Sequence, residues 1–180
     1  MPNPQKFSHL DAKGTAKMVG VGHKDVQFRR ATAAGKLFCA PATIRLLKKL
    51  ALPKGDVLGV ARIAGIQAVK RTADLIPLCH PLPLYQIEIN FRVRTREIEI
   101  ECRVETEAKT GVEMEALTGV SVAALTLYDM CKAVDKKMRI SEIHVVEKLK
   151  SARNEVSRGV GGRSQVKLGN EGRLTGGVPK

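Results

Sequence analysis

The fold is decided by two adjoining stretches, QIEINFRV at residues 86–93 and EIEIECRVE at residues 97–105. In each stretch apolar side chains alternate with polar or charged ones, which is the period of a β-strand with one buried and one solvated face. Only the polar segment Arg94-Thr95-Arg96 separates them. The two stretches therefore predict an antiparallel hairpin, with Cys102 on its apolar face and in the core.

The segment before this hairpin predicts two helices. Residues 42–50 have helical spacing between Pro41 and Pro53, and residues 57–75 have it after a candidate N-cap, Asp56. Small residues follow one side of the second helix, which suits close packing against a sheet. They are Ala61, Ala64, Gly65 and Ala68.

Further strands are predicted on both sides of these elements. Alternating stretches occupy residues 18–21, 26–38 and 140–146, with Gly20, Gly22 and Gly35 expected to break the first two. Helices that alternate with antiparallel strands predict an α+β fold with its helices packed on one face of the sheet.

The composition predicts one domain and a basic tail. The chain has 180 residues and a formal net charge of +13, with 43% hydrophobic but only 3% aromatic residues. That length suits a single domain with an aliphatic core, which we place at residues 1–150. Residues 151–180 combine many glycines and basic residues with few large apolar groups, so we predict a disordered basic C-terminal tail there. The positive charge favours a polyanionic partner.

The sequence favours a cytoplasmic protein that has no membrane partner. It has no apolar run long enough to cross a bilayer, and its first residues lack the apolar segment of a signal peptide. The four cysteines are widely scattered without a CxxC pair, and the histidines lack metal-ligand spacing. This spacing favours reduced thiols over a disulfide framework, and we predict no metal site.

The segment GVEMEALTGVSVAALTLYDMCK at residues 111–132 predicts a helix that is uncharged in its middle and charged at both ends. The spacing from Glu115 to Asp129 corresponds to about 21 Å along a helix axis. The two carboxylates serve different purposes, or a symmetric neighbour brings opposite helix ends together. Simpler explanations also stay open: Glu113 and Glu115 can complement the helix dipole, and Asp129 and Lys132 can form a surface ion pair.

Three motifs carry a family resemblance: Lys54-Gly55-Asp56, DLIPLCHP at residues 74–81, and KTGVEMEAL at residues 109–117 followed by YDMCKAV at residues 128–134. In order and spacing they resemble the molybdenum cofactor biosynthesis protein C family, the cyclic pyranopterin monophosphate synthases. The resemblance spans roughly residues 7–148. It implies a ferredoxin-like fold and a homo-oligomer, most simply a hexamer built as a trimer of dimers with active sites at subunit interfaces.

The resemblance also implies a reaction and its residues. The substrate is a cyclised dihydro-GTP, (8S)-3′,8-cyclo-7,8-dihydroguanosine 5′-triphosphate, which is converted to cyclic pyranopterin monophosphate with release of pyrophosphate. No cofactor is implied, and Mg²⁺ accompanying the triphosphate is left open. The implied catalytic residues are Asp129, Lys132 and Lys54. The implied substrate-binding residues are Leu78, Cys79, His80, Glu113, Met114, Glu115, Arg29 and Lys148.

Two departures from the family pattern affect the predicted site. Gly20 stands where the family usually has an aspartate, and residues 149–153 replace a glycine-rich turn after the last strand. A catalytically weakened family member is therefore one alternative. A basic nucleic-acid-binding module is the other, although the hairpin offers only Tyr85 and Phe91 for base stacking.

Overall fold

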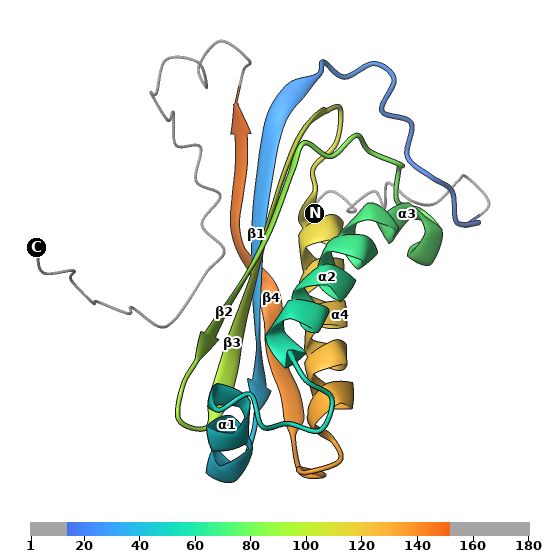
Figure 1. Ribbon diagram of the computed structural model, residues 1–180. Helices are drawn as coiled ribbons and strands as arrows, with labels where there is room; N and C mark the ends of the chain where they lie inside the picture. Colours follow the sequence, from blue (N-terminus) through green and yellow to red (C-terminus); the bar gives the residue numbers. More distant parts are fainter. Residues whose placement is uncertain (1–13, 152–180) are drawn as a thin grey trace, which may run out of the picture.

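The computed structural model of the chain describes residues 14–151 (Figure 1). Within this range four strands form one antiparallel sheet in the order β2-β3-β1-β4. Helices connect β1 to β2 and β3 to β4, so the chain has the ferredoxin-like βαββαβ arrangement, and the predicted fold class is confirmed. The strands are β1 (Gln27–Phe38), β2 (Gln86–Val93), β3 (Glu97–Ala108) and β4 (Arg139–Ser151); the helices are α1 (Pro41–Lys48), α2 (Val57–Lys70), α3 (Thr72–Leu75) and α4 (Glu113–Cys131).

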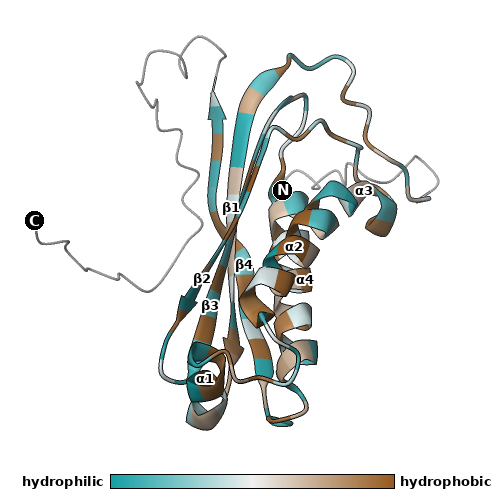
Figure 2. Cartoon of the chain, viewed as in Figure 1, coloured by the Kyte–Doolittle hydropathy of each residue, from teal (hydrophilic) through white to brown (hydrophobic). Residues whose placement is uncertain are grey.

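Helices α2 and α4 lie on one face of the sheet, and both carry long hydrophobic stretches (Figures 1 and 2). The core between them and the sheet is aliphatic, as the composition predicts. Cys102 on β3 is fully buried in it, which confirms its predicted place. The largest fully buried side chains on the sheet side are Leu37, Ile98, Ile100 and Val104, and α4 contributes Val120 and Leu127.

Two glycines allow these layers to approach closely. A Cβ atom added to Gly35 on β1 would lie 2.7 Å from Val120 Cγ1 on α4. Gly35 therefore does not break β1, contrary to the sequence-based expectation, but makes room for α4 in the middle of a continuous strand. On α2 an added Cβ at Gly65 would meet the side chain of Ile89 on β2 and the carbonyl oxygen of Gly119 on α4. The small side of α2 thus packs against both the sheet and α4.

Several predicted elements end at different residues, and the differences are largest for α2 and β4. The helix expected over residues 57–75 is interrupted at Arg71, where the Thr72 hydroxyl donates to the carbonyl oxygen of Val69 at 3.0 Å and competes with the helical hydrogen bonds. The last strand continues to Ser151, beyond the predicted end at Val146, because the long β1 offers pairing partners as far as Phe28.

A third element is absent. Residues 18–21 form no strand, and this segment belongs to an irregular arm, residues 14–26, that leads into β1. Asp56 caps α2 as predicted, since its carboxylate accepts from the Gly59 N–H at 2.9 Å. Apart from Ser151, the predicted basic tail lies outside the described residues, as does the segment 1–13.

Candidate active site

Asp129, Lys54 and Lys132 form a compact cluster at the C-terminal end of α4. Lys54 Nζ lies 2.7 Å from Asp129 Oδ2, and Lys132 Nζ lies 2.7 Å from Asp129 Oδ1. Lys54 also donates to the backbone carbonyl of Asp129 at 3.2 Å. All three side chains are about half exposed, at 42% for Lys54, 52% for Asp129 and 57% for Lys132. The three predicted catalytic residues therefore meet within one chain.

The two lysines fix the charge of this cluster. Hydrogen bonds from Lys132 and then from Lys54 lower the pKa of Asp129 to about 2. In return, the hydrogen bond to Asp129 raises the pKa of Lys132. The aspartate is therefore anionic and Lys132 protonated at neutral pH, which leaves the cluster with an excess positive charge that is open to solvent. Such a cluster suits a phosphate-bearing ligand.

A buried carboxylate fixes the backbone next to this cluster. Asp135, which lies just beyond α4, is only 7% exposed. Its Oδ2 accepts from the Ala40 N–H at 2.7 Å and from the Thr43 hydroxyl at 3.0 Å, and its Oδ1 accepts from the Lys137 N–H at 3.1 Å. Ala40 is the N-cap residue of α1 and has no capping side chain, and Asp135 accepts its N–H, which is the bond that the N3 carboxylate makes in a capping box. It thereby ties α1 to the end of α4.

A pocket of about 400 Å³ lies at the opposite, N-terminal end of α4. Its size falls within the range of small-molecule sites. Residues 78–80, which follow α3, and residues 113–115, which begin α4, meet in its wall, so six of the predicted substrate-binding residues come together. The sequence analysis missed the remaining walls: Val19, Val21 and Lys24 of the arm, Leu82, and Thr110 and Gly111 before α4. The apolar alternation around Gly20 thus belongs to a pocket wall.

The two glutamates of the pocket lie in different environments. Glu115 is 4% exposed, and this burial, together with the nearby negative charge of Glu113, raises its pKa. Glu113 instead forms an ion pair with Lys148 of β4. Burial also raises the pKa of the Cys79 thiol, and Glu115 adds to this effect, so the thiol stays neutral at pH 7. The pocket therefore holds a carboxyl group that accepts a proton more readily than an exposed one.

The remaining predicted cation, Arg29 on β1, is nearly buried beside this end of the molecule. Its Nε donates to the carbonyl oxygen of Ala108 at 3.0 Å, and its Nη2 donates to that of Lys109 at 3.2 Å. Arg29 does not line the pocket, and these contacts favour a role in holding the loop between β3 and α4.

The pocket and the Asp129 cluster are separated by the length of α4, as the sequence spacing predicts. Within residues 14–151 no group of three or more His, Cys, Asp or Glu side chains is arranged to hold a metal ion. No helix of that range is long and apolar enough to cross a membrane. All four cysteines are free thiols.

These features define a ferredoxin-like protein with two polar clusters at the ends of one helix, suited to a phosphorylated small molecule. The model of the MoaC family matches residues 18–151, and the chain belongs to this family. It is 54% identical over 145 residues to the cyclic pyranopterin monophosphate synthase of Thermomicrobium roseum, an alignment that covers 79% of this chain and 87% of the relative. It is 55% identical to the synthase of Chloroflexus aggregans, covering 79% and 88%. A probable cyclic pyranopterin monophosphate synthase of Pyrococcus furiosus is 52% identical, covering 83% and 99%.

Proposed function

We propose that this protein converts the cyclised dihydro-GTP to cyclic pyranopterin monophosphate with release of pyrophosphate, a step of molybdenum cofactor biosynthesis. One observation carries the proposal. The family motifs, which are far apart in the sequence, gather into two clusters at the ends of α4, and each cluster has the chemistry that part of this reaction needs. The names of the relatives, which are similar over nearly their whole length, support the same reaction.

In this proposal the Asp129 cluster handles phosphate charge and protons. Lys54 and Lys132 provide positive charge for the triphosphate and for the negative charge that develops as pyrophosphate departs. Because Asp129 keeps Lys132 protonated, Lys132 is available as a proton donor. The anionic triphosphate also favours the charged form of the lysine, so Lys132 stays protonated while the substrate is bound.

The pocket supports binding and rearrangement of the base. Leu78 and Met114 offer apolar contact to the ring system, whereas His80 and the carboxyl of Glu115 offer groups for proton exchange. Glu113 is held by Lys148, so their ion pair fixes one side of the pocket. These roles rest on the resemblance together with the positions of the side chains.

We further propose a hexamer in which the two clusters of different subunits complete each active site. The separation along α4 supports this, because one chain does not bring Glu115 and Asp129 to the same small ligand. Large apolar side chains also remain exposed on the helical layer. They include Val60 at 47% and Ile63 at 57% on α2, and Leu125 at 59% on α4. A cytoplasmic location is proposed with it, in keeping with the four free thiols.

The experiment is a pyrophosphate-release assay with the cyclised dihydro-GTP. The wild-type protein is expected to release pyrophosphate, and Lys132→Ala to be inactive while keeping its fold. Mixed assemblies of Asp129→Asn and His80→Ala subunits should regain part of the activity, because some interfaces then combine two intact clusters. Absence of turnover in the wild-type protein would defeat the proposed reaction, and lack of recovery in verified mixed assemblies would defeat the shared site.

A catalytically weakened family member remains the second candidate because of Gly20. This residue lies in the arm beside Val19 and Val21, which line the pocket, and no carboxylate stands at its position. An added Cβ at Gly20 would meet nothing within 4 Å, and its backbone is outside the left-handed region. An aspartate would therefore fit at position 20. The effect of the missing carboxylate can then be measured by comparing Gly20→Asp with the wild-type protein.

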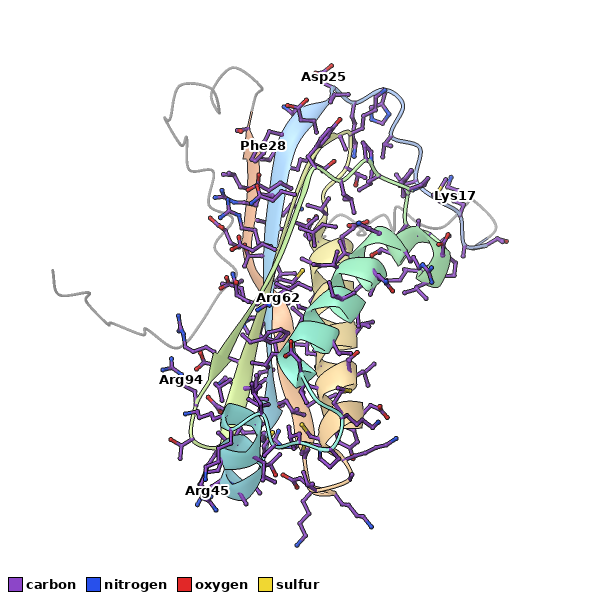
Figure 3. The ribbon with its side chains drawn as sticks, in the orientation of Figure 1. Lys17, Asp25, Phe28, Arg45, Arg62 and Arg94 are labelled. Carbon is purple, nitrogen blue, oxygen red and sulfur yellow. The ribbon has the colours of Figure 1, made fainter. Side chains whose placement is uncertain are left out.

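The nucleic-acid alternative is less well supported. The sheet face away from the helices would be its platform, yet its Lys36 pairs with Glu97, and Arg92 and Arg94 pair with Glu99. These glutamates offset the positive charge that a phosphate backbone needs. Phe91 is not available for base stacking on that face, because it points toward the helices. The centroid of its ring lies 5.6 Å from Cζ of Arg62 on α2. Figure 3 labels Arg62 between α2 and the sheet.

A further inference from the structure

The arm that forms one wall of the pocket belongs to no helix or strand. It runs across the end of the molecule from Lys17, beside α3, to Asp25, where β1 is about to begin (Figure 3). A turn in the arm is closed by a hydrogen bond from the Lys24 N–H to the carbonyl oxygen of Val21 at 3.0 Å. This turn places Val21 and Lys24 in the pocket wall. Its position relative to α4 must be fixed by contacts from elsewhere in the chain.

Lys109 supplies such a contact. Its Nζ donates to the carbonyl oxygen of Gly22, inside the turn, at 2.6 Å. Lys109 lies directly after β3 and directly before Thr110 and Gly111, which line the pocket from the other side. One side chain therefore joins two walls of the same pocket.

The backbone of Lys109 is held in turn by Arg29. The Arg29 guanidinium donates to the carbonyl oxygens of Ala108 and Lys109, and Arg29 lies on β1, just after the arm. Arg29 is 9% exposed, so these hydrogen bonds are largely shielded from water. Arg29 and Lys109 thus form a chain of contacts from β1, through the loop before α4, to the turn of the arm.

We propose that Lys109 is a positioning residue of the active site, which holds the arm against the pocket so that Lys24 faces the bound substrate. The proposal rests on the proposed function for its ligand, but the attachment of the arm is independent of any ligand. Lys109 itself does not line the pocket, so it acts through the arm and not on the reacting atoms. Arg29 supports Lys109 by fixing its carbonyl group.

The expected consequence is a change in binding more than in chemistry. Without the Lys109 hydrogen bond the arm spends part of its time away from the pocket, and the substrate must bear the cost of ordering it. Since the arm contacts the substrate and the transition state alike, KM should rise by about fivefold, with kcat changed less than about twofold.

The test combines hydrogen–deuterium exchange without substrate and steady-state kinetics. In Lys109→Met, amide exchange across residues 18–24 should accelerate by about fivefold, since an ionic hydrogen bond to the turn is lost. Exchange in α1, at the other end of the molecule, should stay unchanged. Lys109→Arg keeps a charged donor and should restore both slow exchange and low KM. Lys48→Met on α1, which removes a different exposed lysine, controls for the loss of charge.

The outcomes separate this inference from the proposed reaction. Unchanged exchange in residues 18–24 of Lys109→Met would overturn the attachment of the arm, whatever the activity. Faster exchange with an unchanged KM would overturn the positioning role. If the wild-type protein does not turn over the cyclised dihydro-GTP, the proposed reaction fails, and the exchange data still decide whether Lys109 holds the arm.

Discussion

Asp135 offers a sharp test of how the Asp129 end of the molecule is built. Replacing Asp135 with alanine removes the acceptor for the Ala40 N–H, the Thr43 hydroxyl and the Lys137 N–H. Losing the acceptor of the Ala40 N–H costs about 1 kcal/mol. Leaving the buried Thr43 hydroxyl and the Lys137 N–H without this partner costs about 1 kcal/mol each. Asp135→Ala should therefore lower the free energy of unfolding by about 3 kcal/mol, and the melting temperature by about 10 °C.

The assay is urea denaturation at one fixed protein concentration, because assembly would otherwise contribute to the measured stability. Asp56→Ala is the matched control, since Asp56 caps α2 through a single hydrogen bond to the Gly59 N–H. That control should lose only about 1 kcal/mol. A loss below about 1 kcal/mol in Asp135→Ala would refute the idea that this carboxylate caps α1 and ties it to α4.

The pH dependence gives a second readout of the same residue. Burial favours the neutral form of Asp135, but the hydrogen bonds from Ala40, Lys137 and Thr43 outweigh it, and the net effect lowers its pKa. The unfolded chain then holds this proton more tightly than the folded one. The contribution of Asp135 is present above the usual aspartate pKa of 3.8 and is lost as the pH falls through the lower folded value. Asp135→Asn should show a weaker loss of stability below about pH 4 than the wild-type protein.

Three further predictions concern the proposed site. Asp129→Asn and Lys132→Ala should each lower kcat by at least about a hundredfold with little change in melting temperature, because both side chains are exposed; near-normal turnover in circular-dichroism-verified protein would rule out their roles. Glu115→Gln should raise the free energy of unfolding at pH 7, because it removes a buried carboxyl whose pKa is raised. Urea titrations at several pH values should show that this gain in stability becomes smaller toward pH 4. Gly20→Asp should raise kcat more than it changes KM while leaving the melting temperature unchanged; an unaltered kcat would show that the family carboxylate is not needed here.

The sequence predicted the elements whose pattern is strong and local. The hairpin of β2 and β3 alternates without interruption, and α4 has a long uncharged middle, so both were located closely. Strand β4 was underestimated for a physical reason. The predicted strand ends at Val146, where the register with β1 shifts between Glu147 and Val145. Beyond it Glu147, Lys148 and Lys150 are charged, so the apolar alternation stops there. An edge strand with irregularities of this kind leaves a weak periodic signal.

For the candidate site, too, the sequence predicted some residues and not others. Motif spacing brought out the residues at both ends of α4, but not the side chains that hold them in place. Asp135 meets Ala40 from 95 residues away, and Lys109 reaches Gly22 across 87 residues. In both contacts a backbone group is the partner, so the partner's residue type carries no information. Such contacts depend on the finished fold and have no signature in the sequence.

The two acids of α4 differ in a way that bears on the proposed mechanism. Asp129 lies between two lysines at an exposed helix end, and its pKa of about 2 keeps it anionic. Glu115 is buried at the other end, where burial and then the charge of Glu113 shift its pKa in the opposite direction. When their surroundings shift the pKa values of two carboxyl groups in opposite directions, the two groups are suited to different roles. Asp129 is suited to orient charged lysines, and Glu115 to exchange a proton with the substrate. If the two groups act on one substrate molecule, they must belong to different subunits, because α4 keeps them apart within one chain. The proposed division of roles between Asp129 and Glu115 therefore requires an active site shared between subunits.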